Sequence, residues 1–139
     1  MPDIPWSTPT PAAPDAEVHV MASRFETATL TGALRFFLKA PGIIAQVRKA
    51  PGAHGVALRA RVLRRTFLTL SAWEDRDALH RFARSEPHRS GSRAAASYMR
   101  ESTFTFWTVP AGELPLTWAE AERRLAAESA RQDERKRGH

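Results

Sequence analysis

The sequence predicts an α+β protein whose antiparallel strands form one sheet with helices packed against it. Two observations lead to this class. Apolar and polar residues alternate with the period of a strand in four segments, and the segments between them carry apolar residues at helical spacing. The order along the chain is strand, helix, strand, strand, helix, strand, with one more helix at the end.

The four strands are expected over residues 17–25, 56–62, 66–73 and 103–109. Each has two faces, because successive side chains of a strand point to opposite sides of the sheet. In the first strand, Val18, Val20 and Ala22 alternate with His19, Met21 and Ser23. In the third, Leu68, Leu70 and Ala72 alternate with Phe67, Thr69, Ser71 and Trp73. In the fourth, Phe104 and Phe106 alternate with Thr105 and Trp107.

The helices have recognisable ends. Residues 33–50 have helical spacing with Pro41 inside, which fits either one bent helix or two short helices over 33–39 and 42–49. Asp75 is the expected N-cap of a helix that runs through Phe82. Pro87 interrupts this region, and residues 93–100 have helical spacing again. Thr117 is expected to cap a terminal helix that ends at about residue 132.

The 139 residues fit one domain with a segment of different composition at each end. Residues 1–15 hold five of the ten prolines, and proline removes backbone donors and fixes φ. We therefore expect an extended, mobile arm from which Trp6 docks on the surface of the domain. Residues 16–130 form the α+β domain with its terminal helix. The charged residues 131–139 are expected to be disordered.

Composition excludes several classes of site. There is no cysteine, so disulfides, thiolate metal sites and cysteine nucleophiles are absent. No apolar run is long enough to span a bilayer and no secretory signal is evident, so we expect a cytoplasmic protein with no membrane partner. The net charge of +6 is compatible with nucleic-acid binding, but the basic residues do not gather into one patch with aromatic residues between them. Nucleic acid is therefore not the expected partner.

The order of elements is that of the ferredoxin-like split βαβ unit, in which four antiparallel strands carry helices on one face. The other face also holds large apolar side chains and needs cover. A second copy of the sheet would cover it, and two sheets packed face to face make a dimeric α+β barrel. We therefore expect a homodimer.

The segments from Leu68 to Asp75 and from Phe106 to Gly112, with Phe82 and His88 between them, carry a resemblance to a known group. On these residues the chain resembles the dimeric α+β barrel superfamily, specifically its antibiotic-biosynthesis-monooxygenase-like branches and an uncharacterised family within it. Residues 35–55 are also similar to spheroidene-monooxygenase-like proteins. The match covers about residues 17–125. The resemblance implies relatives of three kinds: cofactor-independent oxygenases of polycyclic aromatic compounds, haem-binding oxygenases, and proteins of no known activity.

His88 is the main catalytic candidate. The resemblance implies an imidazole near this point that faces a cavity and serves as proton acceptor or haem ligand, and a neutral imidazole can do either near pH 7. The alternative is a histidine at a helix end that bonds the backbone beside Pro87. His88 could therefore act with no cofactor or with haem, and the residues do not decide between them.

Several other residues are candidates for the wall of a ligand cavity. Trp73 matches the tryptophan that ends the third strand in these relatives, and Phe82 and Trp107 are expected to share the cavity with it. Tyr98 could donate a hydrogen bond to a ligand, and His19 could line the cavity from the first strand. For each of these, ordinary core packing or helix anchoring is the alternative.

Other chemistry is not indicated. No pair of histidines or carboxylates has metal-ligand spacing, and the turn glycines lack the context of a phosphate loop. Arg59 and Arg61 share one strand face. They could hold a carboxylate inside a barrel, or they could be solvated residues that protect a strand edge.

Three functions fit these observations. The first is a monooxygenase-like enzyme that acts on an apolar or aromatic small molecule inside the cavity. The second is a non-catalytic module that binds haem or another small molecule. The third is a dimerisation module with a packed interior. The resemblance favours the first.

Overall fold

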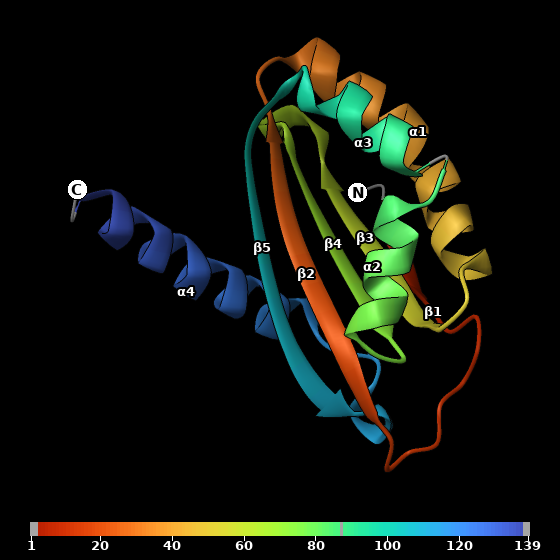
Figure 1. Cartoon of the computed structure of the whole chain (residues 1–139). Coiled ribbons are helices and arrows are strands. Elements are labelled where there is room, and N and C mark those ends of the chain that lie inside the picture. The colour runs from red at the N-terminus through yellow and green to blue at the C-terminus, as the bar shows by residue number, and fades with distance from the viewer. Residues whose placement is uncertain (1–2, 87, 138–139) are drawn as a thin grey trace.

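The chain forms an antiparallel sheet of five strands, with three helices on one face and a fourth on the other (Figure 1). The computed structural model describes residues 3–86 and 88–137, and all statements of structure concern these residues. The elements are β1 (Ile4–Ser7), β2 (Glu17–Thr27), α1 (Leu30–Lys49), β3 (Ala53–Arg61), β4 (Thr66–Trp73), α2 (Arg76–Arg84), α3 (His88–Ala96), β5 (Met99–Pro110) and α4 (Trp118–Arg137). The strand order β1-β3-β4-β2-β5 confirms the ferredoxin-like α+β class, with β1 added at one edge.

The two faces of the sheet divide as the alternating pattern predicted. We call the side covered by α1, α2 and α3 the helix face and the opposite side the α4 face. Val18, Val20 and Leu70 belong to the cluster on the α4 face, whereas Phe67 and Trp73 belong to the cluster on the helix face. All five side chains are at most 1% exposed.

Helix α1 runs through Pro41 as one continuous helix, which decides between the two alternatives left open by the sequence. Thr29 caps its first turn, because its side chain accepts a hydrogen bond from the Gly32 backbone N–H at 3.0 Å. The buried side of the helix continues past the proline, with Phe36 before it and Ile44 after it. Burying each of these side chains contributes roughly 1.5–3 kcal/mol, enough together to offset the roughly 3 kcal/mol that a proline costs inside a helix.

The two caps predicted for the later helices are present. The Asp75 carboxylate accepts a hydrogen bond from the Ala78 N–H at 2.8 Å, and the Thr117 hydroxyl accepts one from the Glu120 N–H at 3.2 Å. The helix expected over residues 93–100 is shifted toward the N-terminus. Helix α3 spans His88–Ala96, and Met99 and Arg100 already belong to β5. The reason is that β2 is longer than its alternation indicated, and it pairs with β5 as far as Met99.

Both ends of the chain carry more structure than their composition indicated. In the arm, residues Ile4–Ser7 pair with β3, and the Asp3 carboxylate accepts a hydrogen bond from the Ala60 N–H at 3.2 Å. Trp6 docks on the domain as expected, against Gly55. In the terminal segment expected to be disordered, α4 continues to Arg137, and Arg131 pairs with Glu128 at 2.8 Å one turn earlier. Ion pairs at this spacing stabilise a helix.

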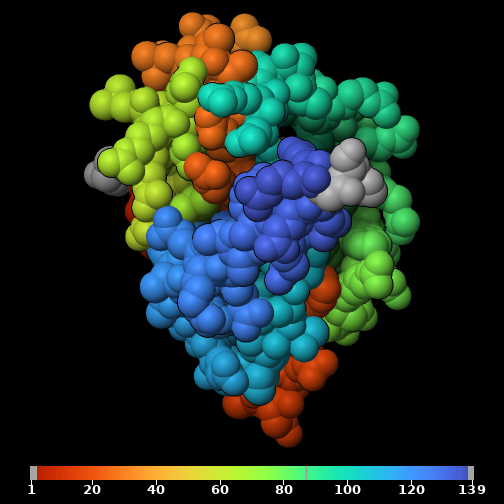
Figure 2. All heavy atoms as spheres, turned by 90° about the vertical axis from the view of Figure 1, so that its left-hand side faces the viewer, coloured from red at the N-terminus to blue at the C-terminus, as the bar shows by residue number. Residues whose placement is uncertain are grey.

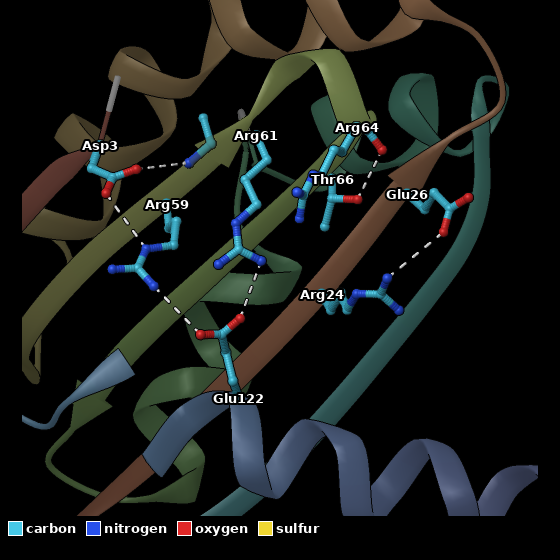
Figure 3. Close-up of polar contacts among 9 residues, drawn as sticks. Asp3, Arg24, Glu26, Arg59, Arg61, Arg64, Thr66 and Glu122 are labelled. Carbon is cyan, nitrogen blue, oxygen red and sulfur yellow. Dashed lines mark hydrogen bonds and ion pairs between the residues drawn. The ribbon is translucent and has the colours of Figure 1, made fainter. Parts of the chain in front are cut away.

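Helix α4 covers the apolar part of the α4 face. Ala121 and Leu125 are almost fully buried there, and Glu122 forms ion pairs with Arg61 at 3.2 Å and Arg59 at 3.4 Å on β3 (Figure 3). Figure 2 shows the same helix passing over the outer side of the sheet. The face that a second copy was expected to cover is therefore covered within the chain, and the two arginines hold α4 in place.

None of the helices in the described part of the chain is long and apolar enough to cross a membrane.

Candidate functional site

A cavity of about 1150 Å³ lies between the helix face of the sheet and helices α1, α2 and α3. Its walls are mainly apolar. The strands contribute Met21, Phe25 and Trp73 among others, and α1 contributes Phe36 and Ile43. This volume is at or above the upper end of the range usual for small-molecule sites.

One end of the cavity is formed by three rings in a row. Trp73 ends β4, and its ring lies 5.3 Å from that of Phe82 on α2. Phe82 lies 4.6 Å from the imidazole of His88, at the start of α3. All three residues line the cavity, so the structure brings together Trp73, Phe82 and His88 as predicted from the sequence. We call these three residues the tryptophan end.

Trp73 is held in one orientation. It is 1% exposed, and its indole N–H donates a hydrogen bond to the Ser71 hydroxyl at 2.9 Å. A buried tryptophan whose N–H has a partner is both packed and satisfied. Its ring is therefore a fixed support for Phe82, whose half-buried ring lies beside it.

His88 has the geometry of a proton acceptor. Its Nδ1 lies 3.3 Å from the carbonyl oxygen of Ala83, and because a carbonyl can only accept, we assign the ring proton to Nδ1. Nε2 is then the nitrogen that can take up a proton or bind a metal. A hydrogen bond from His88 to the backbone was the alternative to a catalytic role. The observed contact with Ala83 anchors the ring and also sets its tautomer.

Three of the hydroxyl groups that line the cavity lie close together on β2 and β4, and none of them was predicted from the sequence. Ser23 and Thr69 are paired across β2 and β4, and their hydroxyls are hydrogen bonded to each other. Ser71 lies two residues further along β4. Ser23 is 0% exposed and Ser71 is 4% exposed, so these are polar groups inside an apolar wall. The sequence pattern could have indicated them, because Ser23 alternates in phase with Met21, and Thr69 and Ser71 alternate in phase with Trp73.

Tyr98 also lines the cavity, at the turn between α3 and β5. Its hydroxyl is buried and has no hydrogen-bond partner within the described residues. Burial raises the pKa of this phenol above its ordinary value, and the guanidinium of Arg35, 5.7 Å from the ring centre, acts in the opposite sense. Tyr98 is therefore a neutral donor that lacks an acceptor.

His19 lies on the helix face but is not among the residues that line the cavity. Its imidazole stacks on the ring of Phe106 at 5.7 Å, and it pairs with Trp73 across the strands. Burial lowers the pKa of His19, and the nearby charges of Arg76 and His80 lower it further. Its role in the described structure is to pack beside the tryptophan end.

Trp107 lies on the opposite face, which corrects the expectation that it shares the cavity with Trp73. In the pairing of β5 with β2, Trp107 is opposite Val20, a residue of the α4 face. Its ring is covered by the guanidinium of Arg124, whose carbon lies 4.4 Å from the ring centre. The sequence correctly predicted which residues alternate within each strand. Whether Trp73 and Trp107 lie on the same face of the sheet depends on the register between strands, which the sequence does not show.

Comparison with known proteins identifies the family. The model of the family described as Domain of unknown function (DUF3291) matches residues 25–133. The chain belongs to this family. A search of the curated proteins found no match.

Solved structures share the fold of this DUF3291 protein. One is SnoaB from Streptomyces nogalater, a cofactor-independent oxygenase, with 19% identity, a TM-score of 0.54, and coverage of 68% of this chain and 94% of that one. Another is an antibiotic biosynthesis monooxygenase, with 16% identity, a TM-score of 0.56, and coverage of 65% and 95%. A third is a conserved protein from Methanosarcina mazei, with 12% identity, a TM-score of 0.59, and coverage of 67% and 93%. At these identities the likeness shows the fold.

The residues of the cavity fit haem in part. His88 offers an imidazole nitrogen that could bind iron, and Lys39 and Arg100 are cationic groups among the lining residues that could pair with propionates. Arg100 already pairs with Glu26 at 3.1 Å, so one of the two cations is engaged elsewhere.

Proposed function

We propose that this DUF3291 protein is a monooxygenase-like enzyme that acts on an apolar or aromatic small molecule in the cavity between sheet and helices. The observation that carries the proposal is the tryptophan end. A phenyl ring supported by a buried indole and an imidazole with an available Nε2 meet at one end of an apolar cavity. The oxygenase activity named for SnoaB, which shares the fold, supports the same reaction class.

The reaction that these residues could support needs no metal. His88 takes a proton from an acidic C–H of the bound ligand, and the electron-rich carbanion reacts with molecular oxygen. In the balanced change, a methylene group and one molecule of oxygen give a carbonyl group and one molecule of water. The ligand supplies the electrons, one oxygen atom enters the ligand, and the other leaves in water. The ring system of the ligand lies against Phe82 at the tryptophan end, beside His88.

A non-catalytic binder is the second candidate. It is favoured by the partial fit to haem: His88 would hold the iron through Nε2, and Lys39 would pair with a propionate. In this candidate haem would be held without turnover of a substrate. An absorption spectrum taken after addition of haem distinguishes this candidate from a cofactor-free enzyme, because bound haem gives a Soret band and the free protein gives none.

The test is oxygen consumption with anthrone, a tricyclic compound with an acidic methylene. We expect wild-type protein to consume oxygen and to release the quinone, and His88→Ala to lose at least about a hundredfold in rate, the usual contribution of a general base. The matched control is His80→Ala, because His80 is an exposed histidine on α2 outside the cavity. Equal rates for wild type and His88→Ala would remove His88 from the mechanism.

A haem titration, read as an absorption spectrum, runs beside this assay. A Soret band that is lost in His88→Ala and kept in His80→Ala would support the second candidate. Absence of both turnover and a band would leave neither function standing for this cavity.

A further inference from the structure

The helix face of the sheet is organised in four cross-strand rows. In an antiparallel sheet, directly paired residues point to the same side, so the pairing registers define which side chains stand next to each other. The rows along the sheet are Ala53, Trp73, His19 and Thr108; then Val56, Ser71, Met21 and Phe106; then Leu58, Thr69, Ser23 and Phe104; and finally Ala60, Phe67, Phe25 and Ser102.

The first and the last row each belong to an aromatic cluster. At the first row stands the tryptophan end. At the last row Phe25 lies 5.5 Å from Phe104 and 6.0 Å from Phe36, and Phe36 lies 4.6 Å from Phe67. We call these four phenylalanines the phenylalanine end, and three of them line the cavity. Trp73 and Phe67 are six residues apart on β4, so the two ends are separated by roughly 20 Å along the strand.

The two middle rows carry the hydroxyls of this face that are not exposed, since Thr108 in the first row and Ser102 in the last row are exposed. Ser71 lies in the second row, and Ser23 and Thr69 lie in the third. The Ser23 and Thr69 hydroxyls share one hydrogen bond, which uses one of their two protons, and no other side-chain hydrogen bond within the described residues uses the second. A buried O–H without an acceptor is costly, so this pair is suited to donate to an atom that enters the cavity.

We propose that the ligand of this cavity is an elongated apolar molecule with an aromatic or unsaturated group at each end and one hydrogen-bond acceptor, such as a carbonyl oxygen, near its middle. The inference rests on the proposed function and specifies its substrate class. One end of the ligand lies at the tryptophan end against Phe82 and His88, and the other lies among the phenylalanines. The central oxygen accepts a hydrogen bond from Thr69, the half-buried member of the Ser23–Thr69 pair.

Binding of three probes tests the length and the polarity of the ligand separately. The first is a diphenylheptanone, in which a central ketone separates two phenyl rings on one chain. The second is the matching diphenylheptane without oxygen, and the third is a phenylbutanone with one ring. Each displaces N-phenylnaphthylamine, whose fluorescence rises in an apolar site, and dissociation constants are compared for wild type, Thr69→Val, Phe104→Ala and the control His80→Ala.

We expect the two-ring ketone to bind wild type about tenfold more tightly than either other probe, since one hydrogen bond to a buried group or one buried ring is sufficient for a factor of this size. Thr69→Val should abolish the advantage of the ketone over the hydrocarbon. Phe104→Ala should abolish its advantage over the one-ring ketone, and His80→Ala should change neither. Folding of each variant is checked by circular dichroism.

Equal binding of all three probes to wild type would overturn the proposal without reference to any variant. An unchanged ratio of ketone to hydrocarbon in folded Thr69→Val would also overturn it. None of these probes needs to be turned over, so a failed oxygen assay together with the expected ratios would refute the proposed reaction and leave the ligand class intact.

Discussion

The Ser23–Thr69 pair lies in the middle of a mainly apolar wall. Both residues line the cavity from the sheet, and their hydroxyls share one hydrogen bond. A buried polar group costs little when it is paired and much more when its partner is removed. The pair should therefore be visible in stability as well as in binding.

We expect Thr69→Val and Ser23→Ala each to lower the free energy of unfolding by about 1–3 kcal/mol, because each leaves one buried hydroxyl without a partner. The double variant should lose less than the sum, since it removes both groups together. Urea unfolding of the four proteins measures this coupling. Strictly additive losses would show that the two hydroxyls do not depend on each other.

His19 should make stability depend on pH. Its folded-state pKa is lowered from 6.5, mainly by burial, so the unfolded chain takes up a proton more readily than the folded one. This stability is fully present above the ordinary pKa and is lost as the pH falls below about 6.5. In His19→Gln the thermal midpoint should fall less between about pH 7.5 and 5.5 than in wild type. The same pH dependence in both proteins would contradict this account.

At the scale of residues, the sequence predicted the tryptophan end but not the whole cavity. Trp73, Phe82 and His88 are near each other along the chain, so a strand, a cap and a helix suffice to bring them together. Trp107 was placed on the wrong face because the register of β5 against β2 is a long-range property. The three hydroxyls were missed because Ser and Thr in a strand are ordinary on either face.

Strand β1 shows how an arm of unfavourable composition gains structure. Prolines prevent the arm from forming a central strand, but at an edge it needs only one side of its backbone. Gly55 on β3 lies directly under the indole of Trp6, and a Cβ at this position would overlap the ring. The absence of a side chain at Gly55 therefore allows the Trp6 ring to approach the backbone of β3 this closely.

We expect Gly55→Ala to expel Trp6 and to detach β1 from β3. Loss of the contact should lower the free energy of unfolding by about 1–3 kcal/mol, the usual range for exposing one large apolar side chain. Limited proteolysis of the arm and urea unfolding measure the two effects. The control is Gly42→Ala, where no atom lies within 4 Å of the added Cβ and the change should be neutral or stabilising. An arm as resistant as that of wild type would rule out this role for Gly55.

At the scale of elements, most strands and helices followed from periodicity and caps. The exceptions have a common cause, because each depends on a partner that lies far away in sequence. The arm became a strand beside β3, and β5 was extended by pairing with β2. The helix through Pro41 persists because its buried side packs on the sheet on both sides of the proline.

In the whole molecule, helices of the same chain lie on both faces of the sheet, and α4 covers the apolar part of the α4 face. The need to cover an apolar α4 face therefore no longer argues for a second copy. What remains in favour of a dimer is the edge strand β5, where Phe104 and Phe106 are 39% and 49% exposed, together with the resemblance to dimeric barrels. An edge strand with exposed apolar residues is a surface on which another chain can pair.

We expect the protein to be a homodimer, so light scattering after size-exclusion chromatography should give twice the chain mass of 15.5 kDa. The mass should be independent of salt if apolar contacts dominate the interface, because salt screens only charge interactions. A mass of one chain at all concentrations would show that α4 has replaced the partner.

The apolar cavity between sheet and helices can be tested by filling it with larger side chains. All four of the following residues are exposed: Gly42 and Gly91 line the cavity with no atom within 4 Å of an added Cβ, whereas Ala45 and Ala94 on the same two helices do not line it. We would measure the dissociation constant of N-phenylnaphthylamine for wild type, for Gly42→Phe with Gly91→Phe, and for Ala45→Phe with Ala94→Phe. We expect binding to wild type and to the alanine-site variant, and at least about tenfold weaker binding when the cavity is filled. Equal affinity for all three proteins would place the apolar site elsewhere, and no binding to any would contradict a ligand cavity.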